Sequence, residues 1–160
     1  GFARNEVETL EPVDLMSVLG DAVRLMQRRL TDEHVTLQIP ENSGPVMVVG
    51  GPIRLQQVIV NLMNNAVDAM SESVQKSMVL CIEQTKGSVM LRVSDTGSGL
   101  KAPDRVFEPF YTTKDLGASK GLGLGLALSF GIIESFDGHI SCQNTSDGGA
   151  VFTVDLPSIL

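Results

Sequence analysis

The stretch "GPIRLQQVIVNLMNNAVDAM", residues 51–70, has the clearest helical pattern in the chain. Gly51 can cap a helix that begins at Pro52, because proline suits the first helical position. On a helical wheel one side is apolar and gathers Leu55, Val58, Ile59, Leu62, Ala66, Ala69 and Met70. Another side is polar and gathers Arg54, Gln57, Asn61, Asn64, Asn65 and Asp68. The pattern predicts an amphipathic helix with one face in a core.

The asparagines of this helix need an explanation. Asparagine is a poor helix-interior residue because its amide competes for backbone hydrogen bonds. Asn61 and Asn65 are four positions apart, so they share one face, at the edge of the apolar arc. Taken alone, the pattern leaves two alternatives equally open, a solvated face or a site wall. An amide oxygen is a suitable ligand for Mg²⁺ that is shared with substrate phosphates.

The patterns on either side of this helix predict the fold class. A helix is predicted in residues 12–30, short strands in 34–40 and 45–50, and a hairpin in 77–95 that turns at Lys86-Gly87. A glycine-led helix in 121–136 and a hairpin in 138–157 that turns at 147–149 follow. This order predicts an α+β two-layer sandwich, a mixed β-sheet with helices on one face.

The domain organisation is simple. We expect residues 1–11 to be an upstream linker remnant and residues 12–160 to form one domain. The segment from 96 to 120 is long for a loop in a compact domain, and such loops are commonly functional lids or disordered. We place a lid at about residues 100–120 and expect it to be mobile without a ligand. The chain does not begin with Met or a signal peptide, so we expect a piece of a longer protein.

Composition excludes several classes of protein. The 160 residues have 42% hydrophobic content, which predicts a globular domain. The net charge of −7 argues against nonspecific nucleic-acid binding. No run approaches the length of a membrane span. Cys81 and Cys142 have no metal-binding spacing, and we expect two reduced core thiols in a cytosolic protein, with a disulfide as the less favoured alternative.

A first glycine cluster follows the predicted strand that ends at Asp95. A carboxylate can accept a hydrogen bond from an exocyclic amine such as that of adenine. Gly97 and Gly99 would let a flat ring approach the backbone. The alternative is an ordinary tight turn, which the motif alone favours.

A second glycine cluster, "SKGLGLGLALS" in residues 119–129, opens the last predicted helix. Free N–H groups at a helix N-terminus can bind phosphate, and glycines also permit close helix packing. The spacing matches neither the dinucleotide fingerprint nor the Walker loop. Two glycine-rich turns that flank a long loop, together with an asparagine-lined helix, favour a nucleotide site.

Four motifs resemble those of sensor histidine kinases. "NLMNNAVDA" (61–69) resembles the N box, and "DTGSGL" (95–100) resembles the first glycine box. "VFEPFYTTK" (106–114) resembles the F box, and "GLGLGLALS" (121–129) resembles the second glycine box. The resemblance runs from about residue 12 to 157 and is closest to nitrogen-regulatory and dicarboxylate-sensing kinases. It implies the Bergerat ATP-binding fold, which gyrase, Hsp90 and MutL share.

The resemblance also implies roles for single residues. Asn65 would ligate Mg²⁺, and Asn61 would face the phosphates one turn earlier. Asp95 would bind the adenine amino group, with Gly97 and Gly99 shaping its pocket. The residues expected to close on the triphosphate are Gly121, Leu122, Gly123, Leu124 and Gly125. Lys114 and Lys120 are expected either to contact phosphate or to be solvated, and Phe107 and Phe110 either to anchor the lid or to fill the core.

Two departures from the family pattern bear on the reaction. Many relatives have a basic residue at the position of Asp68, so the positive charge would come from Arg54, Lys114 or Lys120. ATPases of this superfamily place a glutamate base at the position of Asn61, and an amide cannot act as a base near neutral pH. We therefore expect a kinase domain that does not hydrolyse ATP efficiently.

The resemblance implies the partners and the location as well. A protein-histidine kinase of this type uses ATP and Mg²⁺ and transfers phosphate to a histidine on a dimerisation domain of the same parent protein, with a response regulator downstream. His34 and His139 are expected at the surface or a sheet edge, so the chain should not phosphorylate itself. We expect a monomeric cytoplasmic domain that binds no nucleic acid, from a homodimeric parent anchored in the bacterial inner membrane. The alternatives are an ATPase like gyrase, Hsp90 or MutL, a nucleotide-inactive interaction module, and an anti-sigma serine kinase.

Overall fold

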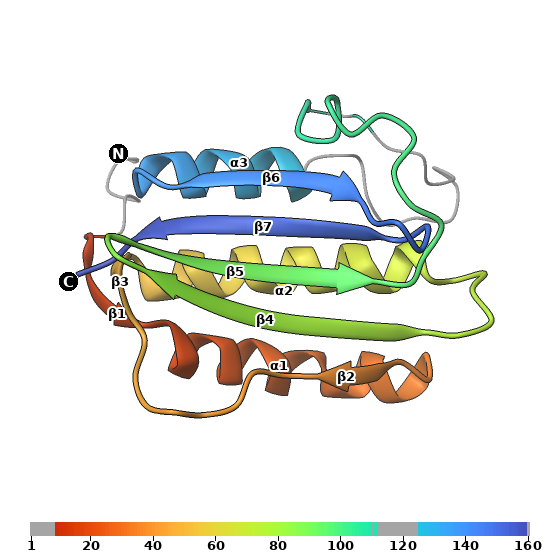
Figure 1. Ribbon diagram of the computed structural model, residues 1–160, viewed down its shortest axis with the longest axis horizontal. Helices are drawn as coiled ribbons and strands as arrows, with labels where there is room; N and C mark the ends of the chain where they lie inside the picture. The colour runs from red at the N-terminus through yellow and green to blue at the C-terminus, as the bar shows by residue number, and fades with distance from the viewer. Residues whose placement is uncertain (1–8, 110, 112–124, 160) are drawn as a thin grey trace, which may run out of the picture.

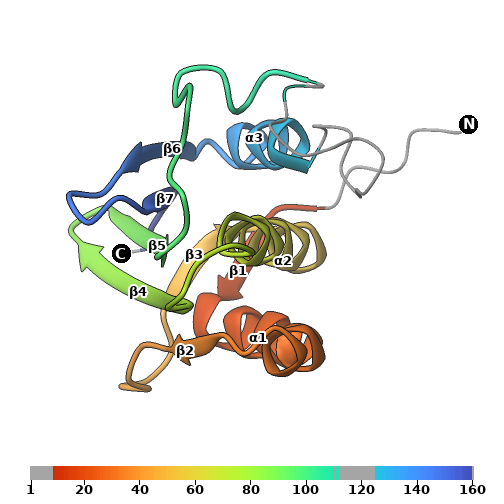
Figure 2. The ribbon, with the colours of Figure 1, turned by 90° about the vertical axis from the view of Figure 1, so that its right-hand side faces the viewer.

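Five strands form a mixed sheet in the computed structural model, which describes residues 9–109, 111 and 125–159. The elements are β1 Glu11–Asp14, α1 Leu15–Asp32, β2 Thr36–Gln38, β3 Met47–Gly50, α2 Pro52–Ala69, β4 Ser77–Thr85, β5 Ser88–Asp95, α3 Gly125–Ser135, β6 His139–Asn144 and β7 Ala150–Pro157. The strands lie in the order β2-β4-β5-β7-β6, and only the β2–β4 pair among them is parallel. The three helices cover one face (Figures 1 and 2). The predicted α+β class is confirmed.

The start of the first predicted helix was wrong. Residues 11–14 form β1, which pairs antiparallel with β3 in a separate two-stranded sheet. The helix α1 begins at Leu15, where Asp14 caps it by accepting a hydrogen bond from the Met16 N–H at 3.1 Å. The same carboxylate oxygen accepts from the Val46 N–H at 3.0 Å, so one side chain ends the strand and begins the helix.

Both predicted hairpins are confirmed. In the β4–β5 hairpin Thr85 pairs with Ser88 across the Lys86-Gly87 turn, and Gly87 has a φ of +89°. This left-handed conformation favours glycine. In the β6–β7 hairpin Asn144 pairs with Ala150 across residues 145–149. The β6–β7 turn therefore lies beside the carboxyl end of β5 (Figure 1).

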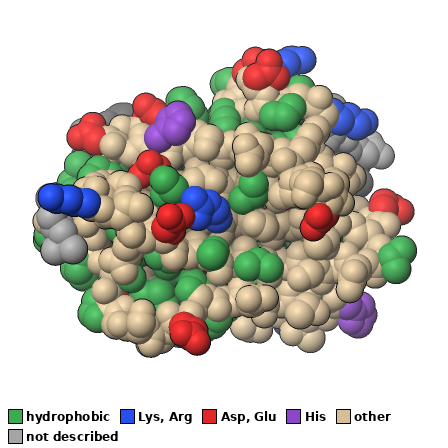
Figure 3. Space-filling model, viewed as in Figure 1, with side chains coloured by type: hydrophobic (Ala, Val, Ile, Leu, Met, Phe, Trp, Pro, Cys, Tyr) green, Lys and Arg blue, Asp and Glu red, His purple; other side chains and the backbone are tan. Residues whose placement is uncertain are grey.

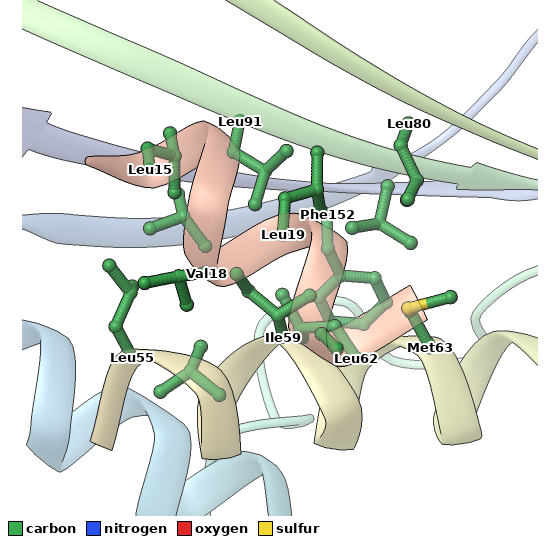
Figure 4. Close-up of a cluster of buried hydrophobic side chains, with 14 of the residues drawn as sticks. Leu15, Val18, Leu19, Leu55, Ile59, Leu62, Met63, Leu80, Leu91 and Phe152 are labelled. Carbon is green, nitrogen blue, oxygen red and sulfur yellow. The ribbon is translucent and has the colours of Figure 1, made fainter. Parts of the chain in front are cut away.

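The core lies between the helices and the sheet. Buried side chains from α1, α2 and the central strands point toward one another (Figure 4): Leu15, Val18, Leu19, Leu55, Ile59, Leu62, Met63, Leu80, Leu91 and Phe152. Each such side chain contributes roughly 1.5–3 kcal/mol on burial. The middle helix, α2, is flanked by α1 and α3 (Figure 2), which explains why Met63 and Val67 are also buried beyond the predicted apolar arc.

The cysteines and histidines lie mostly at the surface. Cys81 is exposed, so the prediction of a core thiol is wrong there, while Cys142 is half-buried and both thiols are free. Burial raises the pKa of the Cys142 thiol to about 11. His34 follows α1 with a φ of +60°, and His139 begins the edge strand β6. Both imidazoles are exposed, as predicted.

The outward face of the sheet carries mixed side chains. Figure 3 shows hydrophobic, acidic and basic groups interspersed, with Lys and Arg scattered singly rather than gathered in a patch. A scattered distribution of this kind does not form the basic stripe that nucleic-acid binding uses. Among the described residues, none of the helices has the length and apolarity needed to cross a membrane.

Candidate nucleotide-binding site

The polar residues of α2 divide between two neighbouring helices. Asn64 and Asp68 face α1, where the Arg29 guanidinium donates to Asn64 Oδ1 and to Asp68 Oδ1, each at 2.6 Å. The Arg29–Asp68 pair is partly exposed, with side-chain exposures of 32% and 22%. Asp68, which stands where many relatives are basic, is therefore engaged in holding α1 against α2. The role of Arg29 could not be predicted from the sequence, because its two partners lie 35 and 39 positions away in the chain.

Removing the Arg29 guanidinium should destabilise the domain. We expect Arg29→Met to lower the free energy of unfolding by about 1–2 kcal/mol, because Asn64 and Asp68 lose a charged partner at a partly buried position. The measurement is urea denaturation followed by circular dichroism. The matched control is Arg28→Met, because the Arg28 side chain is 93% exposed and should change stability by less than about 0.5 kcal/mol. Equal losses in the two variants would contradict the assignment.

Asn61 faces α3 instead. Its side-chain Nδ2 donates to Ser129 Oγ at 3.3 Å and approaches the carbonyl oxygen of Gly125 at 3.5 Å. Ser129 is fully buried. Asn61 thus ties α2 to the first turn of α3, the helix that the second glycine cluster opens.

Asn65 lies one turn further along the same face of α2. It is half-buried, and its side chain makes no hydrogen bond with the described part of the chain. No buried side-chain nitrogen or oxygen of the described residues lacks a partner, so the Asn65 amide reaches solvent. Its oxygen and nitrogen are available to a ligand.

Asp95 is a buried carboxylate at the carboxyl end of β5, with 6% of its surface exposed. Its Oδ1 accepts a hydrogen bond from the Gly97 N–H at 2.8 Å. Burial raises the pKa of Asp95, and the backbone N–H groups of Gly97 and Ala150 partly offset that rise. No Lys, Arg or His of the described residues forms an ion pair with it. A buried carboxylate without a cation is costly to the fold, which is typical of a functional group.

The first glycine turn packs on the protein itself. A Cβ at Gly97 would lie 2.4 Å from the carbonyl oxygen of Ala69, the last residue of α2. Gly99 has a φ of +83°, and a Cβ there would lie 2.7 Å from the carbonyl oxygen of Gly148. Both glycines are therefore required by the fold of the turn.

These contacts place Asn65 between the two glycine clusters. On α2, Asn61 touches Gly125 and Ala69 touches Gly97, and Asn65 is four positions from each. Residues 61, 65 and 69 share one helix face because they are spaced by one turn. The free amide thus lies between the contact of Asn61 with Gly125, at the start of α3, and the contact of Ala69 with Gly97 in the first glycine turn.

Part of the predicted site lies outside the described residues. Those residues are Phe110, Lys114, Lys120, Gly121, Leu122, Gly123 and Leu124. Gly125 is described and begins α3. Phe107 packs on the domain, with its ring 5.6 Å from that of Phe130 and 6.0 Å from that of Phe152.

The arrangement defines a class of protein, an α+β domain whose middle helix contacts a glycine turn through Ala69 and the start of α3 through Asn61, with the Asn65 amide between the two contacts. Residues 50–159 match the family described as histidine kinase-, DNA gyrase B-, and HSP90-like ATPase. The chain belongs to this family, and it is an ATP-binding catalytic domain of the histidine kinase type.

Curated relatives are sensor kinases. The chain is 33% identical to the sensor kinase CckA of Brucella abortus, over 99% of this chain and 18% of CckA. It is 34% identical to the sensor protein FixL of Bradyrhizobium diazoefficiens, over 99% of this chain and 30% of FixL. It is 33% identical to the C4-dicarboxylate transport sensor protein DctB of Pseudomonas aeruginosa, over 97% of this chain and 26% of DctB. The chain thus spans less than a third of these relatives, and they do not favour the predicted alternatives.

Solved structures agree on the fold. The catalytic domain of histidine kinase ThkA superposes with a TM-score of 0.81 at 23% identity, covering 94% of this chain and 98% of that one. The full-length structure of ShkA in complex with AMPPNP gives a TM-score of 0.80 at 26% identity, covering 98% of this chain and 32% of that one.

Proposed function

We propose that this domain binds ATP with Mg²⁺ along the Asn61–Asn65 face of α2 and presents the γ-phosphate to a histidine on a separate domain of the same parent protein. The observation that carries the proposal is the free Asn65 amide, which lies on α2 between the contact of Asn61 with Gly125 and the contact of Ala69 with Gly97. Asp95 is the proposed hydrogen-bond acceptor for the base, and it lies at the end of this face, where Gly97 packs on α2.

Asn65 is the proposed ligand for the metal ion. An amide oxygen suits Mg²⁺, which keeps several waters and is held jointly with substrate phosphates. Among the described residues no group of three His, Cys, Asp or Glu side chains could hold a metal ion by itself. A metal site in which the nucleotide phosphates and water supply most of the ligands needs only one ligand from the protein, and the free Asn65 amide can supply it. When bound, the ion would neutralise charge on the phosphates.

Asp95 is the proposed acceptor for the amino group of adenine. Only the ionised carboxylate offers acceptors without a competing donor. One carboxylate oxygen is already held by the Gly97 N–H at 2.8 Å, which orients the group. Gly97 and Gly99 would shape the pocket beside it.

Asn61 takes no proton in the proposed reaction. Its amide is not basic, and its Nδ2 donates to Ser129 Oγ at 3.3 Å. Phosphoryl transfer depends mainly on positioning and charge neutralisation, so a domain without its own base can present phosphate to a nucleophile from elsewhere. We expect little hydrolysis of ATP by this domain alone. Phosphate found on His34 or His139 after incubation with ATP would contradict an external acceptor.

The second glycine cluster and the basic residues complete the proposal. The N–H groups of residues 121–125 would contact the triphosphate. Because the acidic Asp68 stands where many relatives have a basic residue, positive charge for the phosphates would come from Arg54, Lys114 or Lys120.

The proposal extends to the parent protein. It would be a homodimer anchored in the bacterial inner membrane, with this monomeric domain in the cytoplasm and a response regulator downstream. The relatives CckA, FixL and DctB are sensor proteins, and a structure of ThkA holds the response regulator protein TrrA. Residues 1–11 would be a linker and residues 12–160 the catalytic domain. We expect no nucleic-acid partner.

A titration with and without Mg²⁺ tests the role of Asn65. We expect Mg²⁺ to strengthen ATP binding to the unmodified chain, and Asn65→Ala to weaken binding of the Mg²⁺ complex about tenfold, as for one lost interaction of about 1.4 kcal/mol. Adenosine should bind both proteins equally, because it carries no phosphate. The measurement is isothermal titration calorimetry.

The matched control is Asn64→Ala, because Asn64 is the neighbouring asparagine and faces α1. It should leave the affinity for the ATP complex unchanged. If the folded, unmodified chain gives no heat with ATP or ADP, the proposed function is wrong. If Asn64→Ala and Asn65→Ala weaken binding equally, the metal assignment is wrong.

A further inference from the structure

Asn144 fastens the chain where it leaves the first glycine turn. Its Oδ1 accepts a hydrogen bond from the Leu100 N–H at 2.6 Å, and its Nδ2 donates to the Leu100 carbonyl oxygen at 3.1 Å. One amide therefore satisfies both backbone groups of a residue 44 positions away. Two bonds to one peptide segment fix its orientation as well as its position.

The β6–β7 turn touches the same segment at two further points. A Cβ at Gly149 would lie 2.0 Å from the backbone oxygen of Asp95. A Cβ at Gly99 would lie 2.7 Å from the backbone oxygen of Gly148 and 3.1 Å from Oδ1 of Asn144. The turn and the segment from Asp95 to Leu100 thus meet backbone to backbone, and Asn144 supplies the side-chain bonds between them.

The attachment continues along β6 and the adjoining core. Cys142 Sγ lies 3.5 Å from the Pro103 carbonyl oxygen, and Val106 is buried with 3% exposure. The Phe107 ring packs on those of Phe130 and Phe152. Residues 100–107, the first part of the predicted lid, are therefore held on the domain. Among these attachments of residues 100–107, that of Asn144 to Leu100 lies nearest to Asp95 in the chain.

We propose that Asn144 is a positioning residue for the nucleotide site. The Ala69 carbonyl oxygen holds the middle of the turn by accepting from the Ser98 N–H at 3.1 Å, and Asn144 holds its far end at Leu100. Asn144 thereby helps to fix the Gly97–Gly99 backbone relative to the Asp95 carboxylate, so that the pocket for the base has its shape before the nucleotide arrives. A site that is ordered in advance loses less free energy on binding than one that the ligand must order. This inference rests on the proposed function, because it concerns the base end of that site.

The proposed role of Asn144 concerns the base end of the nucleotide site and not its phosphate end. Asn144 touches the first glycine turn, whereas Asn65 lies a helix turn away from it and Gly125 lies on α3. Loss of the Asn144 hydrogen bonds should therefore weaken the binding of adenosine, of ADP and of the Mg²⁺ complex of ATP by the same factor. Loss of the Asn65 amide should weaken only the binding of the nucleotide that carries both Mg²⁺ and phosphates.

The test is Asn144→Ala in the full chain, at a temperature where circular dichroism shows both proteins folded. The loss of two hydrogen bonds at an exposed position should weaken the binding of adenosine, of ADP and of ATP with Mg²⁺ by about five- to tenfold each. Hydrogen exchange of the Leu100 amide should become faster without nucleotide. Asn144→Ser, whose hydroxyl can make one of the two bonds, should give an intermediate loss and also serves if the alanine variant does not fold.

The matched control is Gln143→Ala, since Gln143 is the exposed neighbour on β6 and its side chain makes no hydrogen bond in the described part of the chain. It should change neither affinity nor exchange. Faster exchange with unchanged affinities would show that Asn144 only stabilises the loop, and would overturn the inference while the proposed function stands. A loss confined to ATP with Mg²⁺ would overturn it as well. If the unmodified chain binds no adenine compound, the proposed function fails, and the positioning role fails with it.

Discussion

Asp95→Asn is expected to weaken the binding of adenosine, ADP and ATP by about 100-fold, the value of one hydrogen bond to a charged group at a buried site. The variant is nearly isosteric and its amide oxygen can still accept from the Gly97 N–H. The other carboxylate oxygen becomes an NH₂ group, which opposes the amino group of adenine donor to donor. Calorimetric titration measures the loss.

The control is Asp104→Asn, because Asp104 is exposed and makes no hydrogen bond or ion pair with the described residues. It should leave the affinities unchanged. Equal affinities of the Asp95→Asn variant and the unmodified chain would remove Asp95 from the site. A loss confined to ATP, with adenosine unaffected, would place the carboxylate near the phosphates instead of the base.

The pH dependence of the same pair of proteins follows from the raised pKa of Asp95. Burial lifts this pKa above the ordinary value of 3.8, so the folded state takes up a proton at higher pH than the unfolded state does. The contribution of Asp95 to stability is thus greatest below pH 3.8 and is lost as the pH rises through the raised value. Relative to Asp95→Asn, the unmodified chain should gain stability as the pH falls, while its nucleotide affinity declines. Urea unfolding of both proteins across pH measures the first trend, and a difference in stability that does not vary with pH would contradict it.

A methyl group at Gly149 is expected to destabilise the domain by about 3 kcal/mol or more, the upper range for overpacking. The added Cβ would lie 2.0 Å from the backbone oxygen of Asp95 and 3.0 Å from its carbonyl carbon. A backbone group cannot rotate away as a side chain can, so β7 and β5 would have to separate at their paired ends. Urea denaturation measures the loss.

Gly131→Ala is the matched control for Gly149→Ala. Gly131 lies within α3, and a Cβ there would have nothing within 4 Å. Alanine is the better helix former, so this variant should be more stable by up to about 1 kcal/mol. If Gly149→Ala proves as stable as Gly131→Ala, the close approach of the β6–β7 turn to Asp95 is wrong.

Local patterns in the sequence predicted the elements that local chemistry determines. The helix from Pro52, the Lys86-Gly87 turn and the turn before Ala150 each depend on neighbours in the chain. The strand β1 was missed because its partner β3 lies more than 30 positions away, and residues 12–14 also fit a helical pattern. Cys81 alternates with buried residues of β4, but the alternation alone did not indicate which face is covered by helices.

The site was predicted in the same uneven way. Asp95 and Asn65 could be predicted as candidate site residues because a strand end and a helix face are local features, and their roles stay predictions. The helical wheel separated the polar residues of α2 from its core, yet it could not show that Asn64 faces Arg29 of α1 while Asn61 faces Ser129 of α3. Asn144 was missed altogether, because its bonds reach a residue 44 positions away and no motif surrounds it.

The position of α2 between two contacts matters for the redesign of ligand preference in this domain. Because α2 contacts one glycine turn through Ala69 and the start of α3 through Asn61, a substitution that displaces this helix would shift both ends of the proposed binding surface together. Redesign for a different purine, or for an analogue-sensitive variant, should therefore begin at the β6–β7 hairpin. There, Asn144 and Gly148 contact the first glycine turn. We therefore expect substitutions in this hairpin to reshape the proposed base end of the site while the Asn61–Gly125 contact is kept.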